Sequence, residues 1–312
     1  MHTRIRVLAA AALAAAGVLL AAACSSADGA SGGAGGSGAI AAVGAENEYA
    51  DVIQQVGGQY VHATAIMSNP NTDPHTFEAS SAVAQQVSGA QLIVQNGVGY
   101  DSFMSTIESA APSSGRKVID VQQLLGLPDS TPNPHLWYKP TTMPAVANAI
   151  AGDLAALRPA HAAYFRARAA AFIRSLAAWD NAIASFRAAY PGTPVATTEP
   201  VADYMLQAVG ADNLTPWAFQ ADIMNGVDPA PQDVATERDL FTQHKVRVFL
   251  YNQQVTDPLT GSLITLAQQN RIPVVGVYET MPVPGYDYQS WMLTEVQDLR
   301  KAVTDKVSTE HL

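Results

Sequence analysis

Two histidines occupy nearly duplicate settings in this sequence. His75 ends the segment Asn-Thr-Asp-Pro-His, and His135 ends the segment Thr-Pro-Asn-Pro-His. A proline fixes its own φ and restricts the residue before it to extended geometry, so each imidazole is presented from a stiff loop. Two rigidly held imidazoles suit a divalent metal ion better than a proton shuttle. Either histidine alone has a plain structural interpretation, and it is the matching pair that predicts a metal site.

Two glutamates are candidate carboxylate ligands for the same ion. Glu199 follows the apolar run 194–197, and Glu279 follows the run 273–278, so each stands at the carboxyl end of a predicted strand. In open parallel sheets, ligands bind outside these strand ends. A carboxylate at the start of a helix is also stabilised by the helix dipole. The pattern by itself leaves both roles open for each glutamate.

The other histidines of the mature chain lack such settings. One falls within a predicted strand, two on predicted helices and one at a terminus expected to fray: His62, His161, His244 and His311. We interpret them as surface or packing residues.

Apolar runs and helical periodicity alternate along the chain. Strands are predicted at 39–43, 60–67, 91–94, 117–121, 194–197, 246–251 and 273–277. Helices are predicted at 46–56, 79–87, 102–109, 143–157, 160–189, 232–244, 257–269 and 290–307. Strands that alternate with helices at this spacing indicate parallel sheets covered on both faces.

The segment 159–189 divides the chain into two such regions. It is rich in Ala, Arg and Phe, and Pro159 suits the first turn of a helix. A helix of this length reaches about 45 Å, the scale of a whole domain. We therefore predict an α/β fold with an N-terminal lobe at 39–158 and a C-terminal lobe at 190–312. Each lobe has a mostly parallel sheet flanked by helices, and one long backbone helix joins them and limits hinge motion.

The N-terminus has the pattern of an export signal. Arg4 and Arg6 precede an apolar run that extends to residue 23, where small residues lead to Cys24. This arrangement resembles the lipobox of bacterial lipoproteins, although Leu20 stands four residues before the cysteine where such boxes usually have three. An ordinary signal peptide is the alternative. Because Cys24 is the only cysteine, it cannot form a disulfide within the chain. Acylation of the thiol would explain why an exported protein has a single cysteine.

Residues 24–38 follow the signal peptide (1–23) as a lipidated cysteine and flexible linker. The segment is nearly all Ser, Gly, Ala and Asp, which cannot bury enough apolar surface to fold. We expect the protein to be anchored by lipid to the outer side of the cell membrane. The chain has 17 basic and 27 acidic residues, a net charge of −10. Such acidity makes an exported protein a poor nucleic-acid binder. Separately, we expect the protein to be a monomer.

Four ordered motifs give the chain a family resemblance. The segments are 44–47, 68–78, 96–101 and 133–137. They look like motifs of the solute-binding lipoproteins of zinc/manganese-type ABC transporters. The resemblance implies a two-lobed clamp, a metal held between the lobes and a membrane permease as partner. It also implies that His75, His135, Glu199 and Glu279 are the four ligands, although aspartate is the commoner residue at the last position.

The donor set narrows the choice of metal without deciding it. Two imidazoles and two carboxylates suit Zn²⁺ and Mn²⁺, and the absence of thiolate or thioether argues against Cu(I). The chain lacks the histidine-rich loop of many zinc-specific relatives and has glutamate as third ligand, which favours manganese. Affinity at N/O sites favours zinc. The choice between the two ions stays open.

Three other functions are compatible with parts of the pattern. A zinc hydrolase needs an open metal position, but a fourth ligand at Glu279 would close it and no His-Glu-x-x-His motif is present. A surface adhesin or interaction lipoprotein would use the metal structurally or not at all. A binding protein for a siderophore or haem would not need the two Pro-His loops. We therefore predict a transport protein without catalytic residues.

The anchor gives a direct test. Replacing Cys24 with Ser removes the thiol that is acylated, so we expect the variant to leave the membrane fraction while its metal binding stays intact. Membrane fractionation and metal titration of the parent and the variant measure both properties. A Cys24→Ser protein that remains wholly in the membrane fraction would contradict the lipoprotein interpretation.

Overall fold

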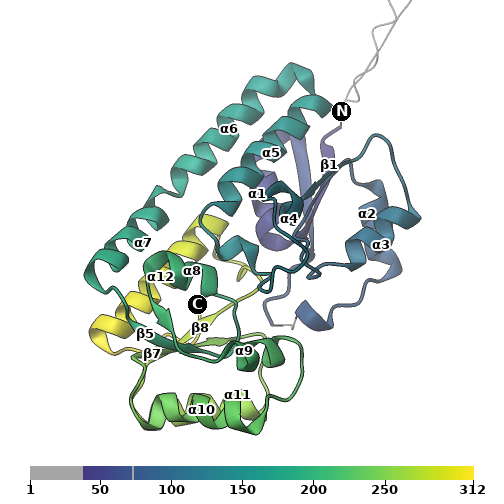
Figure 1. The fold of residues 1–312 in the computed structure, drawn as a ribbon. Helices are drawn as coiled ribbons and strands as arrows, with labels where there is room; N and C mark the ends of the chain where they lie inside the picture. Colours follow the sequence, from purple (N-terminus) through teal and green to yellow (C-terminus); the bar gives the residue numbers. More distant parts are fainter. Residues whose placement is uncertain (1–37, 72–73) are drawn as a thin grey trace, which may run out of the picture. The chain divides into compact units, whose positions relative to one another are not determined.

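Each half of the chain forms a parallel sheet (Figure 1). The computed structural model describes residues 38–71 and 74–312, and within these residues each sheet has four strands. The first sheet has the order β2-β1-β3-β4 and the second β6-β5-β7-β8. The strands are β1 Ile40–Glu46, β2 Val61–Met67, β3 Leu92–Gln95, β4 Lys117–Asp120, β5 Pro194–Thr197, β6 Asp212–Asn213, β7 Val248–Asn252 and β8 Val274–Val277.

Helices cover both faces of each sheet, which confirms the predicted fold class. In the first lobe they are α1 Asn47–Gly57, α2 Ser81–Gly89, α3 Phe103–Ala110, α4 Val121–Leu124 and α5 Thr142–Leu157, with short 3₁₀ turns η1 Gly58–Tyr60, η2 Pro74–Thr76 and η3 Leu136–Tyr138. The linking segment contains η4 Pro159–His161, α6 Ala162–Ser175 and α7 Ala177–Ala189. The second lobe has α8 Asp203–Val209, α9 Trp217–Met224, α10 Pro231–Thr242, α11 Pro258–Gln269 and α12 Tyr288–Asp305.

The linking helices carry one continuous apolar seam. Its residues are spaced alternately four and three apart and are all buried: Phe165, Ala169, Phe172, Leu176, Trp179, Ile183 and Phe186. This spacing keeps one stripe of a helix facing its neighbours. The seam belongs to a single core that also contains β1 and α1 of the first lobe and β7 and α12 of the second. The two lobes therefore share apolar packing along the linking segment.

The linking segment differs from the prediction at one residue. The sequence predicted one helix at 160–189, whereas the structure has α6 and α7 with Leu176 between them. The amide of Leu176 donates to the carbonyl of Ile173 at 3.3 Å, a 3₁₀-type bond that tightens the last turn of α6. The apolar seam stays in phase through this point, which is why the sequence pattern shows no break.

Short elements were missed from the sequence. The strand β6 and the helices α4 and α9 have two to eight residues, too few to show a hydrophobic period. The helix that the sequence predicted to begin near Pro200 is α8, which begins at Asp203. The placement of His244 on a helix was wrong. This residue follows the end of α10 and has φ of +50°, so it lies in the turn that ends the helix.

Buried hydrogen bonds join the lobes beside the strand ends. The side-chain amide of Asn47 donates to the carbonyl of Met281 at 2.8 Å and accepts from its N–H at 2.9 Å. The hydroxyl of Tyr138 donates to the carbonyl of Tyr278 at 2.8 Å. These hydrogen bonds hold Tyr278 and Met281, on either side of Glu279, so the loop after β8 lies against the first lobe.

A further buried carboxyl supports this interface. The side chain of Glu295 on α12 is fully buried, and its Oε1 accepts hydrogen bonds from the Trp291 indole at 2.9 Å and the Tyr138 hydroxyl at 3.1 Å. Burial is the largest effect and raises the pKa of Glu295 from 4.5 to about 8. The hydrogen bonds lower the pKa but do not offset burial. At neutral pH this carboxyl is therefore protonated.

A Glu295→Gln variant tests this protonation. The folded pKa lies above the unfolded value, so the folded protein holds a proton that the unfolded chain releases. This stability is present in full below about pH 4.5 and is lost as the pH rises through about 8. Relative to the variant, we expect the parent's free energy of unfolding to fall by about 1 kcal/mol per pH unit across that window. Urea unfolding across the window measures this, and identical pH profiles would contradict it.

Candidate metal centre

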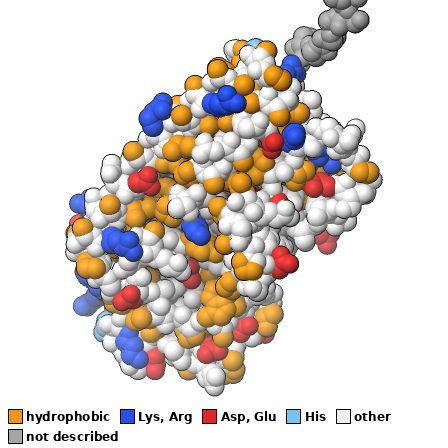
Figure 2. Space-filling view, turned by 45° about the horizontal axis from the view of Figure 1, so that its top comes forward, with side chains coloured by type: hydrophobic (Ala, Val, Ile, Leu, Met, Phe, Trp, Pro, Cys, Tyr) orange, Lys and Arg blue, Asp and Glu red, His pale blue; other side chains and the backbone are white. Residues whose placement is uncertain are grey.

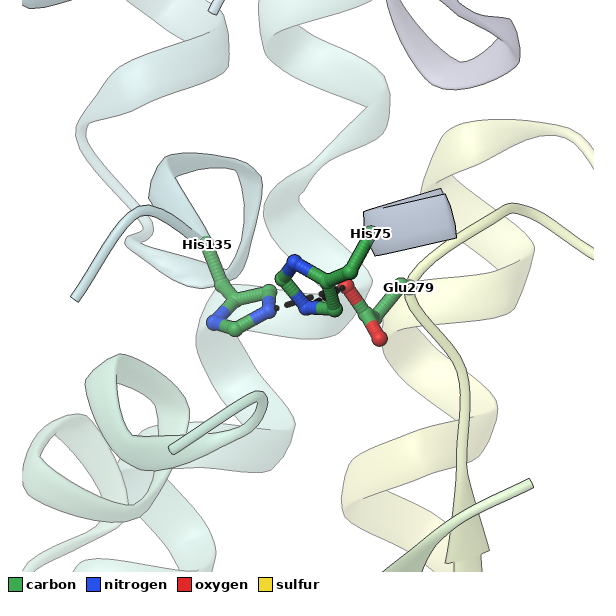
Figure 3. Close-up of side chains that lie close together, drawn as sticks. All are labelled: His75, His135 and Glu279. Carbon is green, nitrogen blue, oxygen red and sulfur yellow. Dashed lines mark hydrogen bonds and ion pairs between the residues drawn. The ribbon is translucent and has the colours of Figure 1, made fainter. Parts of the chain in front are cut away.

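Three predicted ligands converge on one point between the lobes (Figure 3). The Nε2 atoms of His75 and His135 lie 3.2 and 3.1 Å from Oε2 of Glu279. One ligand atom from each residue lies within 4.8 Å of the others. The side chains of His135 and Glu279 are fully buried, whereas that of His75 is 24% exposed. The structure therefore brings together three of the four predicted ligands.

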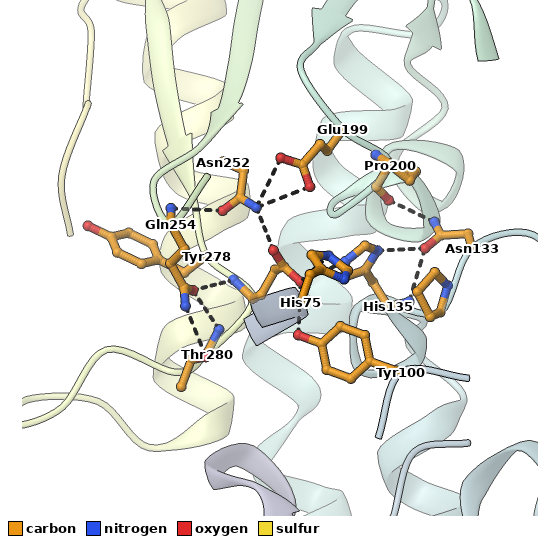
Figure 4. Close-up of polar contacts among 12 residues, drawn as sticks. His75, Tyr100, Asn133, His135, Glu199, Pro200, Asn252, Gln254, Tyr278 and Thr280 are labelled. Carbon is orange, nitrogen blue, oxygen red and sulfur yellow. Dashed lines mark hydrogen bonds and ion pairs between the residues drawn. The ribbon is translucent and has the colours of Figure 1, made fainter. Parts of the chain in front are cut away.

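Each of the three side chains lies beyond a strand end, as the sheet topology requires. His75 lies in η2, after β2, and His135 immediately precedes η3, in the loop after β4 and α4. Glu279 is the second residue after β8. Because the strands of each sheet are parallel, these loops leave the same edge of their sheet. The two edges face one another, so the imidazoles come from the first lobe and the carboxylate from the second (Figure 4).

The amide of Asn133 determines the tautomer of His135. Its Nδ2 donates to the carbonyl of Pro200 at 2.7 Å, so its Oδ1 must face the histidine. That oxygen accepts from the backbone N–H of His135 at 3.0 Å and lies 2.7 Å from Nδ1. Nδ1 therefore carries the proton of the neutral ring. The lone pair of Nε2 points at Glu279, which is the orientation that a metal ligand needs.

The electrostatics of this contact favour a cation. Burial lowers the pKa of His135, although Glu279 raises it, so the ring is neutral at neutral pH. Burial raises the pKa of Glu279, but the contacts with His135 and His75 outweigh burial and hold the pKa of this carboxyl well below its usual range. The ionised Oε2, 3.1 Å from Nε2 of His135 and 3.2 Å from Nε2 of His75, is stabilised by positive charge at this point. A divalent cation bound by the nitrogen lone pairs and the carboxylate would supply that charge.

Donors from both lobes fix the Glu279 side chain, and two of them, Tyr100 and Asn252, are labelled in Figure 4. Its Oε2 accepts from the hydroxyl of Tyr100 at 2.8 Å, and its Oε1 accepts from Nδ2 of Asn252 at 2.5 Å. Oε1 of Gln254 accepts the backbone N–H groups of Glu279 and Thr280, both at 2.8 Å. The position of this carboxylate is therefore set by its surroundings.

The sequence pattern did not predict a positioning role for these residues. Tyr100 and Asn133 stand in the motifs that carry the family resemblance, where they had no role of their own. Asn252 ends β7, and Gln254 lies two residues beyond it. The rule that ligands gather at strand ends covers both residues, but amides carry no charge that would have singled them out.

The structure places Glu199 beside the group of three rather than within it. Its side chain is buried at 2% exposure, in the loop between β5 and α8. Both carboxylate oxygens lie 3.3 Å from Nδ2 of Asn252, which separates this carboxylate from that of Glu279. Its predicted role as fourth ligand therefore stays a prediction.

The remaining predicted residues lie elsewhere. His62 is exposed on β2, and His161 stacks on Tyr60 with ring centroids 3.9 Å apart. His244 is exposed at the end of α10. Among the described residues, the group of His, Cys, Asp and Glu side chains suited to a metal contains none of these three. Cys24, the signal peptide and the linker up to residue 37 lie outside the described residues.

A cleft gives access to the site from solvent. It has a volume of about 500 Å³ and is lined by His75, Tyr100, Phe77 and Phe103 from the first lobe and Met224 from the second. Of the three predicted ligands, His75 lies on its wall, in keeping with its partial exposure.

Two parallel α/β lobes on a linking helix, with imidazoles facing a carboxylate between them, define the class of helix-linked, two-lobed binding proteins. The chain belongs to the ZnuA family, described as the periplasmic component A of the zinc-uptake complex, which matches residues 43–302. The zinc-binding protein TroA of Treponema pallidum is 26% identical over 132 residues, or 41% of this chain. That match spans 42% of TroA, less than half of its length.

Solved structures share the fold at low sequence identity. The Mn-bound periplasmic metal-binding protein of Candidatus Liberibacter asiaticus has a TM-score of 0.68 and 18% identity, covering 85% of this chain and 99% of that one. A mutant of the laminin-binding adhesin Lmb from Streptococcus agalactiae has a TM-score of 0.71 and 16% identity, covering 85% and 100%. At these identities the likeness shows the fold alone.

Substitution of the histidines tests the geometry of the site. We expect His75→Ala and His135→Ala to weaken metal binding by roughly two orders of magnitude or more, because each removes a ligand atom. His161→Ala and His244→Ala serve as matched controls and should leave affinity nearly unchanged, since neither ring is near Glu279. Isothermal titration with Zn²⁺ and Mn²⁺ gives the four values. Equal losses in all four variants would show that the Pro-His loops have no special role.

Proposed function

We propose that this protein is an extracytoplasmic solute-binding protein that captures a divalent transition metal, zinc or manganese, and delivers it to an ABC transporter permease for uptake. One observation carries the proposal: the Nε2 atoms of two histidines in one lobe face a single buried carboxylate oxygen of the other, at 3.2 and 3.1 Å. Membership of the ZnuA family supports the transport role. The metal is the cargo of the protein rather than a resident cofactor.

The ligand set that we propose is His75, His135, Glu279 and Glu199. The first three need no rearrangement, because their ligand atoms already lie together. Glu199 shares Nδ2 of Asn252 at 3.3 Å, a longer contact than the 2.5 Å that the same nitrogen makes with Glu279. We propose that Glu199 turns towards an arriving ion and completes the set as its fourth ligand. Two carboxylates then cancel the charge of the ion, which limits the cost of enclosing it.

Both zinc and manganese fit this donor set. The family is described by zinc uptake, TroA is named a zinc-binding protein, and the Liberibacter protein binds manganese in its solved structure. Nitrogen and oxygen donors alone accommodate either ion. We therefore propose the two ions as the cargo class.

The proposed location is the outer face of the cell membrane, with a lipid on Cys24 as anchor. Among residues 38–71 and 74–312, no helix is long and apolar enough to cross a bilayer. On the face shown in Figure 2, Lys and Arg side chains are interspersed with acidic ones rather than gathered into a basic surface. This pattern supports a protein that binds no nucleic acid. We propose a monomer with lobes at 39–158 and 190–312 and the linking helix between them.

Rival functions have less support. A hydrolase needs a metal position open to substrate and water, and turning Glu199 to the ion closes the four-ligand set, so we propose no enzymatic activity. The likeness to the adhesin Lmb shows only the fold. A site for haem or a siderophore would not need a buried carboxylate between two imidazoles.

Metal analysis tests this function directly. We expect protein purified without added metal to contain close to one equivalent of zinc or manganese, and a chelator to remove it reversibly. Competition between Zn²⁺ and Mn²⁺ then ranks the two ions. Glu279→Gln keeps the shape of the side chain and removes its charge, so affinity should fall sharply with the apo fold intact. Thermal stabilisation by added metal should shrink with it.

Parent protein that binds neither ion would contradict the proposal. Parent-like binding by Glu279→Gln would show that another carboxylate or water completes the site, and the open-site hydrolase would then gain support. Uptake of the preferred ion by cells that lack the protein, compared with cells that express it, separates transport from adhesion.

A further inference from the structure

The side-chain amide of Asn252 holds one of the two oxygens of Glu279. Its Nδ2 lies 2.5 Å from Oε1 of the glutamate, and the residue is 1% exposed. The orientation of the amide is determined by its other end, because its Oδ1 accepts the backbone N–H of Gln254 at 3.0 Å. The backbone N–H of Asn252 in turn donates to the hydroxyl of Thr198 at 3.0 Å. The donor therefore cannot turn away from the carboxylate without breaking a second buried bond.

The two oxygens of Glu279 consequently have different surroundings. Oε2 faces Nε2 of both His75 and His135 and also accepts from the hydroxyl of Tyr100 at 2.8 Å. Oε1 faces the amide of Asn252, on the side where Glu199 lies. An ion bound by the two imidazoles would therefore contact Oε2 of Glu279 first. Oε1 is already engaged by a buried N–H donor, and removing it from that donor leaves the donor without its partner, at a cost of about 1–3 kcal/mol.

The number of oxygens that a carboxylate offers affects the choice of metal. A carboxylate that binds through one oxygen occupies one coordination position, and one that binds through both occupies two. Zn²⁺ is satisfied by four nitrogen and oxygen ligands in a tetrahedron. Mn²⁺ prefers six ligands that are mainly oxygen. A restraint on Oε1 therefore penalises manganese more than zinc.

We propose that Asn252 is a specificity-determining residue of this site, which acts by keeping Glu279 a one-oxygen ligand and so favours Zn²⁺ over Mn²⁺. The inference rests on the proposed function, because it concerns which ion the same site selects. Asn252 touches no ion itself and acts through Glu279 as a positioning residue.

Asn252→Leu removes the donor and keeps a side chain of similar size and shape. We expect the ratio of zinc affinity to manganese affinity to fall on the order of tenfold, the usual scale for a group that orients a metal ligand. Competition titration of both ions in one chelator buffer measures the ratio. Bound Co²⁺ gives a second readout, because its visible absorption is strong at four-coordinate sites and weak at higher coordination. The parent should give the strong spectrum and the variant the weak one.

Asn213→Leu is a matched control. The amide of Asn213 also donates to a carboxylate of the second lobe, that of Asp203, at 2.9 Å, but outside the metal site. The control loses a comparable hydrogen bond, so its stability should fall while the zinc-to-manganese ratio and the Co²⁺ spectrum stay those of the parent. If the control and Asn252→Leu shift the ratio equally, the effect is general destabilisation and the proposal is wrong.

Asn252→Ala keeps the test decisive should the leucine variant fail to fold. Alanine also removes the donor to Glu279 and adds neither bulk nor charge to the site, so the ratio should shift towards manganese again. An unchanged ratio and a parent-like Co²⁺ spectrum in either folded variant overturn the role of Asn252 and leave the metal-capture function standing. A parent protein that binds neither ion overturns both.

Discussion

The contact of one buried carboxylate oxygen with two imidazoles is the constraint on which this structure depends. Burying an ionised carboxylate costs several kcal/mol unless it is paired and hydrogen-bonded. Glu279 is fully buried and ionised, so the surrounding structure has to supply that compensation. Tyr100 and Asn252 donate to its oxygens, and Nε2 of His75 and of His135 lie 3.2 and 3.1 Å from Oε2, where a bound cation would supply the remaining compensation. This arrangement is fully favourable only with a cation, and the protein is therefore organised to select one.

Holding that contact requires the two lobes to keep their relative positions. The imidazoles belong to the first lobe and the carboxylate to the second, so any change of the angle between the lobes changes the distances at the site. The apolar seam of the linking helices enters one core with both sheets. Asn47 and Tyr138 form hydrogen bonds with the backbone of Met281 and Tyr278, and these bonds stabilise the interface between the lobes beside Glu279. His75 lies on the wall of the cleft and is the only one of the three residues whose side chain is partly exposed.

Much of this organisation follows from local patterns in the sequence. Alternating apolar runs and helical periods predicted the two parallel sheets, because strands buried on both faces need continuous apolar residues and their crossovers need helices. The Pro-His pairs predicted the two imidazoles of the site, because proline restricts the backbone beside each histidine. The interruption at Leu176 and the short helix α9 left no local signal. The apolar seam runs unbroken through the first, and the second is too short to show a period.

The sequence by itself determined the fold class, the family resemblance and the pair of Pro-His loops, since each depends on residues that are neighbours along the chain. Only the tertiary structure decided which carboxylate meets the imidazoles. Glu199 and Glu279 have equivalent positions after their strands, yet Glu279 lies 3.1 Å from His135 and Glu199 stands behind Asn252. That difference depends on how two lobes meet across more than a hundred residues of chain. Local propensity carries no information about such a contact, because it is set by the packing of the linking helices and the buried bonds at the interface.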